Sequence, residues 1–262
     1  MLRYFNIIVK FLKYAFIQAL EYKANFILGG LFEFLWVILN VIFFKALYQN
    51  TTSIAGWSVD EVLLLVFICG LVDSVHSFFF ASGFIDIPNL IRQGNLDLLL
   101  LKPINKRFFL SFRLINVGQI LNVIFNVVMI IIYTNKITTN LSPTNVLLFI
   151  LLIISALIIV NAFYFSLSML AFWVIKVNAI IGYSQELFTV GNKPINVYPK
   201  IIQKIFTYLI PLGVAFSYPI LYLSHKLSTS SLIAGFAIAV IFFALSHVLY
   251  RRGIKKYTSA TS

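Results

Sequence analysis

The sequence predicts an all-α membrane protein with six transmembrane helices. Two observations carry this prediction. Of the 262 residues, 61% are hydrophobic and only 11% are charged, whereas soluble domains average about 45–50% apolar and about 25% charged residues. Several apolar runs also approach or exceed the roughly 18 residues that indicate a membrane span. A soluble domain of this length could not bury so much apolar surface.

The formal net charge is +12. On a membrane protein, Lys and Arg mark cytoplasmic loops and contacts with anionic headgroups, so we expect membrane lipids as partners and no nucleic acid. Cys69 is the single cysteine and allows neither an intramolecular disulfide nor a cysteine metal site. No predicted span carries a metal-binding or paired-carboxylate motif, so we expect no metal and no catalytic residue.

Residues 2–21 predict an amphipathic helix. Apolar residues recur at helical spacing, while Arg3, Lys10, Lys13 and Glu21 lie largely off that stripe. Such a helix lies in the headgroup plane of the membrane, here on the basic, cytoplasmic side.

The six spans are expected at residues 24–47, 59–81, 108–134, 145–172, 178–192 and 229–250. The fifth is short, since a span needs about 20 residues. Residues 191–223 contain four prolines, which exclude one straight helix: Pro194, Pro199, Pro211 and Pro219. This segment is either a cytoplasmic loop followed by a bent span or a pair of short re-entrant helices on the outer side. Irregular backbone at membrane depth must pack within protein or face water.

The distribution of basic residues orients the chain. With both termini and the loop at 82–107 in the cytoplasm, the re-entrant arrangement leaves six of the 20 basic residues outside: Lys45, Lys136, Lys193, Lys200, Lys204 and Lys226. Moving residues 191–204 to the cytoplasm would leave only three outside, so the positive-inside rule alone slightly favours that alternative. No linker separates domains, so residues 1–262 form one membrane domain.

The loop at 87–103, IPNLIRQGNLDLLLLKP, stands out because it is punctuated and partly charged. Pro88 suits the first turn of a helix, and Gly94 suits its left-handed terminator. PNLIRQ therefore predicts a short helix, and NLDLLLL a further short turn. A helix this short needs support from the span ends or from a partner. The loop is either an interfacial loop anchored to lipid or a docking element for a cytoplasmic protein.

Three stretches carry a resemblance to a known family. IRQGNLDLLLLKPINKRF resembles the cytoplasmic loop of the permeases of type-2 ABC exporters, in the branch with six spans and no fused ATPase. The ending RRGIKKYTSATS is similar to the basic C-terminus of that branch. KPINVYPKIIQKIFTYLIPLGVAFSYP resembles its segment ahead of the last span.

The resemblance implies a coupling helix that rests in a cleft of a separate nucleotide-binding subunit. Its contact residues would be Pro88, Asn89, Arg92, Gln93, Gly94 and Asp97. The resemblance also implies that residues 2–21 are a membrane-lying elbow helix and that residues 191–223 are re-entrant. The chain has no G-x-x-x-x-G-K-[ST] motif, so ATP and Mg would bind the partner ATPase, and this chain would be a non-catalytic subunit.

Polar residues within the predicted spans require a reason, because a charge at mid-bilayer costs about 2.5–3.5 kcal/mol. They fall in the first three spans: Glu33, Asn40, Asp73, His76, Gln119, Asn122 and Asn126. They either pair between helices or line a translocation path or an interface with a second permease, which could be the same chain or a related one.

The sequence therefore predicts the membrane subunit of an ABC exporter in a prokaryotic cell membrane, with both termini cytoplasmic. Its cargo would be amphipathic or hydrophobic, with peptide, lipid and drug all open. The alternatives are a proton-coupled secondary transporter, in which Asp73 and His76 would be central, and a membrane-embedded lipid-modifying enzyme.

Overall fold

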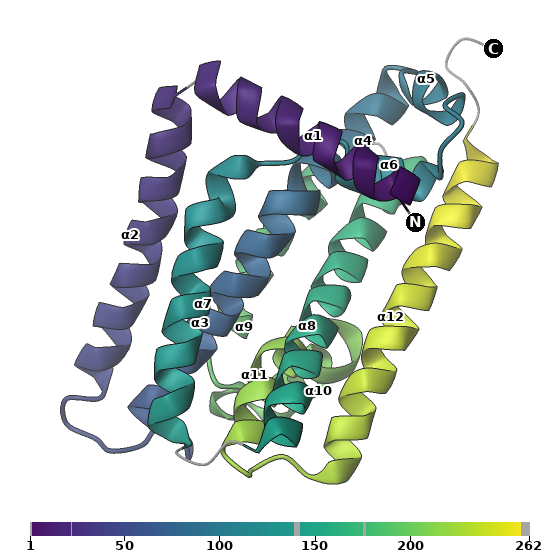
Figure 1. Ribbon diagram of the computed structural model, residues 1–262. Coiled ribbons are helices and arrows are strands. Elements are labelled where there is room, and N and C mark those ends of the chain that lie inside the picture. Colours follow the sequence, from purple (N-terminus) through teal and green to yellow (C-terminus); the bar gives the residue numbers. More distant parts are fainter. Residues whose placement is uncertain (1, 22, 139–141, 175–176, 258–262) are drawn as a thin grey trace.

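The computed structural model describes residues 2–21, 23–138, 142–174 and 177–257. The chain is 83% helical, and the described residues form no strand, so the predicted all-α class is confirmed. In this part of the chain, five helices are long and apolar enough to cross a membrane, or up to six if one bent pair counts as a span. The long helices run side by side from one end of the molecule to the other (Figure 1).

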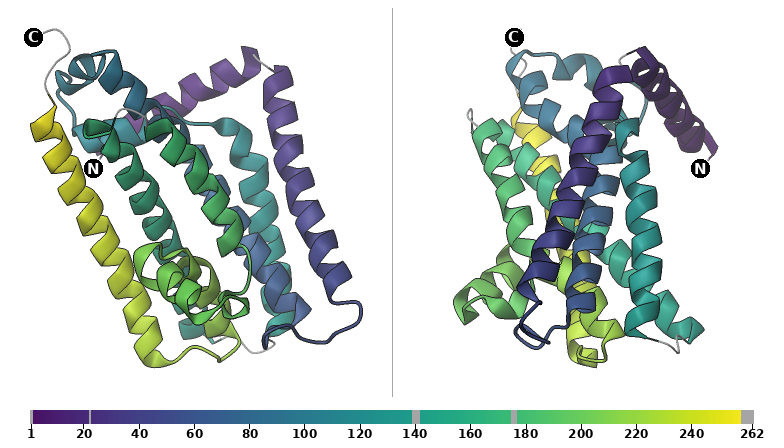
Figure 2. Two further views of the ribbon diagram at one scale, coloured as in Figure 1. Left: turned by 180° about the vertical axis from the view of Figure 1, so that it is seen from behind. Right: turned by 90° about the vertical axis from the view of Figure 1, so that its left-hand side faces the viewer.

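Helix α1 (Leu2–Glu21) lies across the upper end of this bundle, at a steep angle to α2 (Lys23–Leu47) (Figures 1 and 2). Two contacts hold its first turns. The Arg3 guanidinium donates a hydrogen bond of 2.8 Å to the carbonyl of Pro103, and the rings of Tyr4 and Phe108 meet edge to face at 4.8 Å.

Helix α3 (Val59–His76) begins at a capping box, in which the side chains of Ser58 and Glu61 each accept a backbone N–H of the other residue. The helix does not end near residue 81, where the second span was expected to end. A π-helical turn (Ser77–Ala81) joins α3 to α4 (Ser82–Arg92), so one helical run extends over residues 59–92.

Pro88 therefore lies inside α4 and not in the first turn of a separate short helix. The missing N–H of a proline removes one helical hydrogen bond, yet the helix continues for one more turn. The predicted terminator is correct, because Gly94 has a φ of +70° directly after the helix. The short helix α5 (Leu96–Leu100) follows, as the NLDLLLL pattern predicts.

The third predicted span, 108–134, is also wrong at its start. The chain first forms a separate short helix, α6 (Lys106–Phe112), and then breaks. The Asn116 side chain accepts a hydrogen bond from the N–H of Gly118 and begins a new helical run. This run is a 3-10 turn (Val117–Gln119) followed by α7 (Ile120–Ile137).

Helices α8 (Pro143–Met169) and α12 (Thr229–Lys256) match the fourth and sixth predicted spans, although α12 continues six residues beyond the predicted end. Helix α9 (Val177–Gly191) has only 15 residues. At 1.5 Å per residue it is about 22 Å long, less than the roughly 30 Å of a hydrocarbon core. Helix α9 is therefore too short to cross a membrane by itself.

The proline-rich segment forms α10 (Lys200–Lys204), a π-helical turn (Ile205–Leu209) and α11 (Leu212–Leu223). The two arms are bent by 99° at a break that contains Pro211. Both arms lie in the lower half of the molecule, away from α1 (Figure 2). The segment does not return to the upper end before α12 (Figure 2), and a bent pair of this kind is either a broken span or a re-entrant loop.

The core lies around α3 and α8. Every residue from Val62 to Cys69 is buried, and α8 packs against both α11 and α12. Helix α2 is different, because its side chains are largely exposed: Phe32 is 70% and Trp36 59% exposed. It packs on α1, α3, α7 and the 3-10 turn ahead of α7.

Candidate functional site

A cavity of about 830 Å³ lies between α2, α3, α7, α8 and the end of α9. This volume is within the range of about 300–1,000 Å³ that is typical of small-molecule sites. Its wall mixes aromatic rings with amides and charged groups. The lining residues are Phe32, Trp36, Val37, Asn40, Phe43, Phe44, Val66, Cys69, Gly70, Asp73, Ser77, Asn122, Asn126, Tyr164, Glu186, Phe188, Thr189, Asn192 and Lys193.

A chain of amides joins the α2 side of this cavity to the residue that follows α9. Asn192 donates from Nδ2 to Oδ1 of Asn40 at 3.1 Å. Asn40 in turn donates from Nδ2 to the carbonyl of Trp36 at 2.9 Å. The second bond fixes the Asn40 amide, because only its nitrogen can donate to a carbonyl. Asn192 therefore presents its NH₂ to α2, and α2 and the α9 end form one wall.

The polar stripe of α7 bonds along its own helix. Asn122 donates to Oε1 of Gln119 at 3.2 Å, and Asn126 donates to the carbonyl of Asn122 at 2.8 Å. Asn126 also lies against α3, because a Cβ built on Gly70 would be only 2.5 Å from the Asn126 Oδ1. The glycine therefore admits the amide between the two helices, and both residues line the cavity.

Asp73 and His76, which the sequence pairs at i and i+3, have different surroundings. Asp73 lines the cavity. His76 is 5% exposed, and its ring stacks on Tyr164 with centroids 4.8 Å apart. The rings of Phe80 and Phe84 are also within 6.0 Å of it. His76 therefore packs in an aromatic cluster behind the cavity wall.

The structure thus brings together four of the seven polar residues that the sequence places in the path or interface: Asn40, Asp73, Asn122 and Asn126. Gln119 is buried at the start of the same stripe. The side chain of Glu33 lies outside the described part of the structure. Sequence reasoning missed Glu186, although a carboxylate within a predicted span was the signal that could have identified it.

The second candidate surface is the turn between α4 and α5 at the upper end of the molecule (Figure 1). Arg92 and Gln93 are exposed, whereas Asn89, Gly94 and Asp97 are partly buried. Pro88, the sixth expected contact, is buried within the fold. The sequence did not single out Leu98 and Leu101, which are 64% and 80% exposed beside this turn.

Several interactions hold the upper end in place. Leu96 is fully buried and anchors α5. An ion pair of 2.5 Å between Asp86 and Arg113 joins α4 to the connection ahead of α7. Helix α4 is therefore connected to α7 through this ion pair, as well as being continuous with α3.

Arg107 of α6 is a partly buried cation at this end. Its guanidinium lies 4.7 Å from the ring centroids of both Phe165 and Phe243. It also donates to Oγ of Ser246 at 2.7 Å and lies 3.2 Å from Nδ1 of His247. Burial lowers the pKa of this guanidinium, but an arginine remains charged at neutral pH. Arg107 therefore joins α6 to α8 and α12.

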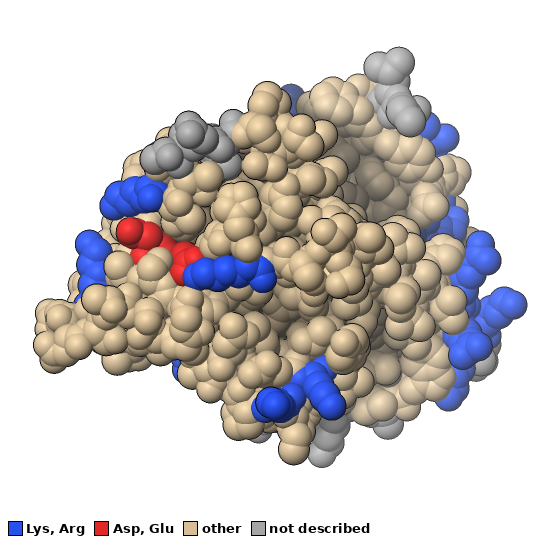
Figure 3. Space-filling model, turned by 90° about the horizontal axis from the view of Figure 1, so that it is seen from below, with Lys and Arg blue, Asp and Glu red and all other residues tan. Residues whose placement is uncertain are grey.

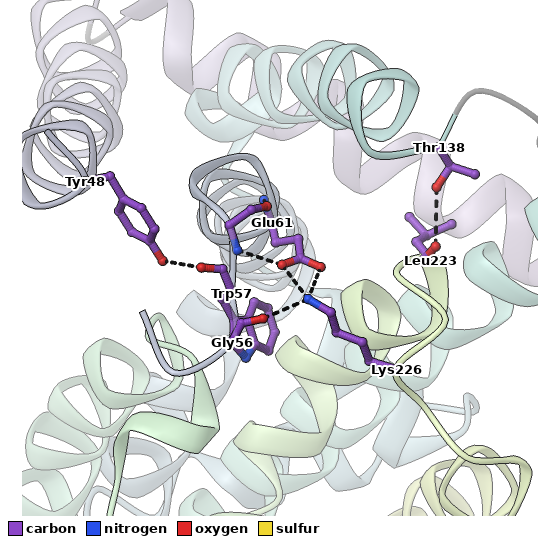
Figure 4. Close-up of polar contacts among 8 residues, drawn as sticks. Tyr48, Gly56, Trp57, Glu61, Thr138, Leu223 and Lys226 are labelled. Carbon is purple, nitrogen blue, oxygen red and sulfur yellow. Dashed lines mark hydrogen bonds and ion pairs between the residues drawn. The ribbon is translucent and has the colours of Figure 1, made fainter. Parts of the chain in front are cut away.

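At the lower end, Lys226 closes the bundle (Figure 4). Its ammonium group contacts both carboxylate oxygens of Glu61 and donates to the carbonyl of Gly56 at 2.8 Å. In the view from below, the acidic side chains of this face form one small cluster with basic side chains against it (Figure 3). Neither Glu61 nor Lys226 was singled out from the sequence.

Membrane transport proteins are commonly multi-pass helical bundles with a binding site between the helices, and this chain has such an architecture. The model of one family, described as ABC-2 family transporter protein, matches residues 34–261. Because this match covers most of the chain, the protein belongs to the ABC-2 transporter family and is a membrane-spanning permease subunit of an ABC transporter. The comparison with curated proteins found no significant match.

Proposed function

We propose that this chain is the permease of an exporter that moves amphipathic or hydrophobic cargo outward and is driven by separate ATPase subunits. One observation carries the proposal. The exposed turn follows directly on the helical run, residues 59–92, that carries Gly70 and Asp73 in the cavity wall. A partner that pushes on the turn would therefore move the wall of the cavity directly.

The chemistry of the exposed turn supports a protein partner. Arg92 and Gln93 offer hydrogen-bond donors, and Leu98 and Leu101 offer exposed apolar surface beside them. The centre of an interface is apolar with a polar rim, and this turn combines both. We infer that the partner ATPase contacts these residues together with Asn89, Gly94 and Asp97, and that ATP and Mg bind in that subunit.

The ATPase would work by changing the population of two permease conformations. ATP would close the ATPase pair and displace the α4–α5 turn. Because the Asp86–Arg113 pair joins α4 to the α7 connection, α3 and α7 would move together. The cavity would then open outward, at the end closed by Glu61 and Lys226. ATP can drive this change only by binding more tightly to one of the two states.

A second permease, the same chain or a related one, would cover the exposed face of α2 and complete the path. Helix α1 would lie in the headgroup plane of a prokaryotic cell membrane. Both termini and the α4–α5 turn would be cytoplasmic, in agreement with the positive-inside rule.

The test is co-purification of the tagged chain with its native neighbours in mild detergent, followed by an assay of Mg-dependent ATP hydrolysis. We expect an ATPase to co-purify, and we expect the double variant Arg92→Ala/Asp97→Ala to lose it or to uncouple its activity. Arg252→Ala is the matched control, since it removes an exposed arginine from the same end of the molecule.

A preparation that transports cargo with no ATPase present would overturn the proposal. If transport then collapsed with the proton gradient and in Asp73→Ala, the proton-coupled alternative would replace it. Covalent change of a membrane lipid by the purified chain would instead support the lipid-modifying enzyme.

A further inference from the structure

The cavity wall has more acidic than basic side chains, whereas the sequence as a whole has more basic than acidic ones. The whole sequence has 20 basic and only 8 acidic residues, but among the described residues the cavity wall carries two carboxylates, Asp73 and Glu186, against one ammonium group, Lys193. The two carboxylates come from different helices, α3 and α9, so they are not a consequence of one local motif. An excess of negative charge in a concave site favours a cationic ligand.

Aromatic rings supply the apolar part of the same wall. Trp36 and Phe43 come from α2, Tyr164 comes from α8, and Phe188 comes from α9. Such rings contact an apolar ligand body, and their faces also attract a positive group within about 6 Å. The wall therefore suits a ligand that is both hydrophobic and positively charged.

Two amide oxygens add partial negative charge. Asn126 and Asn192 both line the cavity, and the Oδ1 atom of each is buried without a hydrogen-bond partner in the described part of the chain. Their orientations are fixed, because each NH₂ group is engaged: Asn126 donates to a carbonyl, and Asn192 donates to the fixed Asn40 amide. The unpaired atoms are therefore acceptor oxygens, and their partial negative charge favours a positive group nearby.

The position of the cavity allows a charged ligand to enter. Helix α9 ends at Gly191, and the next two residues, Asn192 and Lys193, lie in irregular backbone at the cavity wall. Irregular backbone at membrane depth is tolerated where it is packed in protein or faces a water-filled space. A ligand in this cavity would thus remain partly hydrated and would not have to enter pure hydrocarbon.

From these observations we propose that the cavity binds a hydrophobic cation, that is, a ligand with an apolar, largely aromatic body and one positive charge. Asp73 and Glu186 would attract the charge, and the aromatic wall would contact the body. That this ligand is the transported cargo rests on the proposed function. The binding itself does not require an ATPase.

The test uses two probes of nearly the same size and opposite charge, tetraphenylphosphonium and tetraphenylborate. Binding of each to the full chain in lipid nanodiscs is measured by equilibrium dialysis, with empty nanodiscs subtracted. We expect saturable binding of the phosphonium only. Asp73→Asn and Glu186→Gln should each raise its Kd about tenfold, the size expected for one lost charge at close range in a partly hydrated site.

Asp60→Asn is the matched control. It removes one carboxylate from the first turn of α3, outside the cavity, and should leave the Kd unchanged. Asp73→Glu keeps the charge and should restore most of the binding, which separates loss of charge from loss of folding. Lys193→Gln should tighten binding.

Equal affinity for the two probes, no saturable binding, or an equal effect of Asp60→Asn would overturn the proposed ligand class. The role as cargo is tested separately in the assembled transporter, where the phosphonium should stimulate ATP hydrolysis. Binding without stimulation would retain the cation site and refute its assignment to cargo. Failure to recover any ATPase would refute the proposed function and leave the binding result intact.

Discussion

The ammonium group of Lys226 lies 2.6 Å from Oε1 and 2.8 Å from Oε2 of Glu61, and this contact joins the first turn of α3 to the connection between α11 and α12. The Glu61 side chain is only 7% exposed, whereas that of Lys226 is 43% exposed. Glu61 also accepts the N–H of Ser58. One carboxylate thus holds the start of α3 and the closed lower end together.

Replacing the cation of this pair should destabilise the protein. In Lys226→Met the Glu61 carboxylate stays buried with its other hydrogen bonds only, which should cost about 1–3 kcal/mol. Thermal unfolding in detergent should report a lower apparent Tm. Lys200→Met, a change at an exposed lysine of α10, should have little effect. If adding Glu61→Gln to Lys226→Met did not recover stability, the buried charge would not be the cause.

Arg107 should not tolerate lysine. Lysine keeps the charge, but it cannot stack its head group flat between Phe165 and Phe243 and also reach Ser246. Arg107→Lys should therefore lower stability by about 1–2 kcal/mol. The measurement is again the apparent Tm, with Arg252→Lys as the control. Equal Tm values for the two variants would show that the aromatic contacts contribute nothing.

Gly70 should be sensitive to a single methyl group. The Cβ of Gly70→Ala would lie 2.5 Å from Oδ1 of Asn126 and would force α3 and α7 apart. We expect a loss of about 1–3 kcal/mol, with most of it recovered in Gly70→Ala/Asn126→Ala. Gly182→Ala in α9 is the control: no described atom lies within 4 Å of the position its Cβ would take, so it should be neutral or slightly stabilising. A stable Gly70→Ala would contradict the close contact.

The position of α1 can be tested with a fluorophore. Its outer surface carries a row of exposed apolar side chains that nothing in the described chain covers: Phe5, Val9, Phe16 and Leu20. A probe on Phe16→Cys in a Cys69→Ala background should be quenched by lipids labelled just below the headgroups. A probe on Lys10→Cys, on the adjacent polar side, should respond to a water-soluble quencher. The same response at both sites would refute the interfacial placement.

The side on which residues 191–204 lie is also open to direct measurement. Because α10 lies in the lower half of the molecule (Figure 2), Lys200→Cys should react with a membrane-impermeant maleimide from the same side as Thr51→Cys. Lys102→Cys at the upper end should react only from the opposite side. Reaction of Lys200→Cys together with Lys102→Cys would favour the cytoplasmic loop that the positive-inside rule alone prefers.

The sequence predicts the helices well where hydrophobic runs end at clear signals. The first span and the last two-thirds of the third follow from apolar length alone, and Gly94 marks the end of α4. The hydrophobic pattern does not predict helix boundaries that depend on tertiary contacts. The break at residues 113–116 depends on the Asp86–Arg113 pair and on the Asn116 cap, and neither can be recognised from hydrophobicity. Pro88 does not fix the start of a helix, because a proline can lie in the first turn of a helix or inside one.

The residues of the candidate site also include some that the sequence identifies and some that only the structure identifies. A polar residue in an apolar run can be found from the sequence, as Asn40, Asp73, Asn122 and Asn126 were. Which of these residues share a cavity depends on helix rotation and packing, and that separates Asp73 from His76. The pairs between distant segments, such as Glu61 with Lys226, carry no local signal at all, because each partner is ordinary in its own surroundings.

The continuous helical run from Val59 to Arg92 has a consequence for how this chain could tolerate insertions. One residue added between Asp73 and Arg92 would rotate everything beyond it by about 100° and raise it by about 1.5 Å. The exposed turn would then face another direction relative to the cavity. A residue added after Leu101, between α5 and α6, changes only the length of a short connection, which costs little. We therefore expect the spacing from Asp73 to Arg92 to be constant among functional variants, and that from Leu101 to Asn105 to vary.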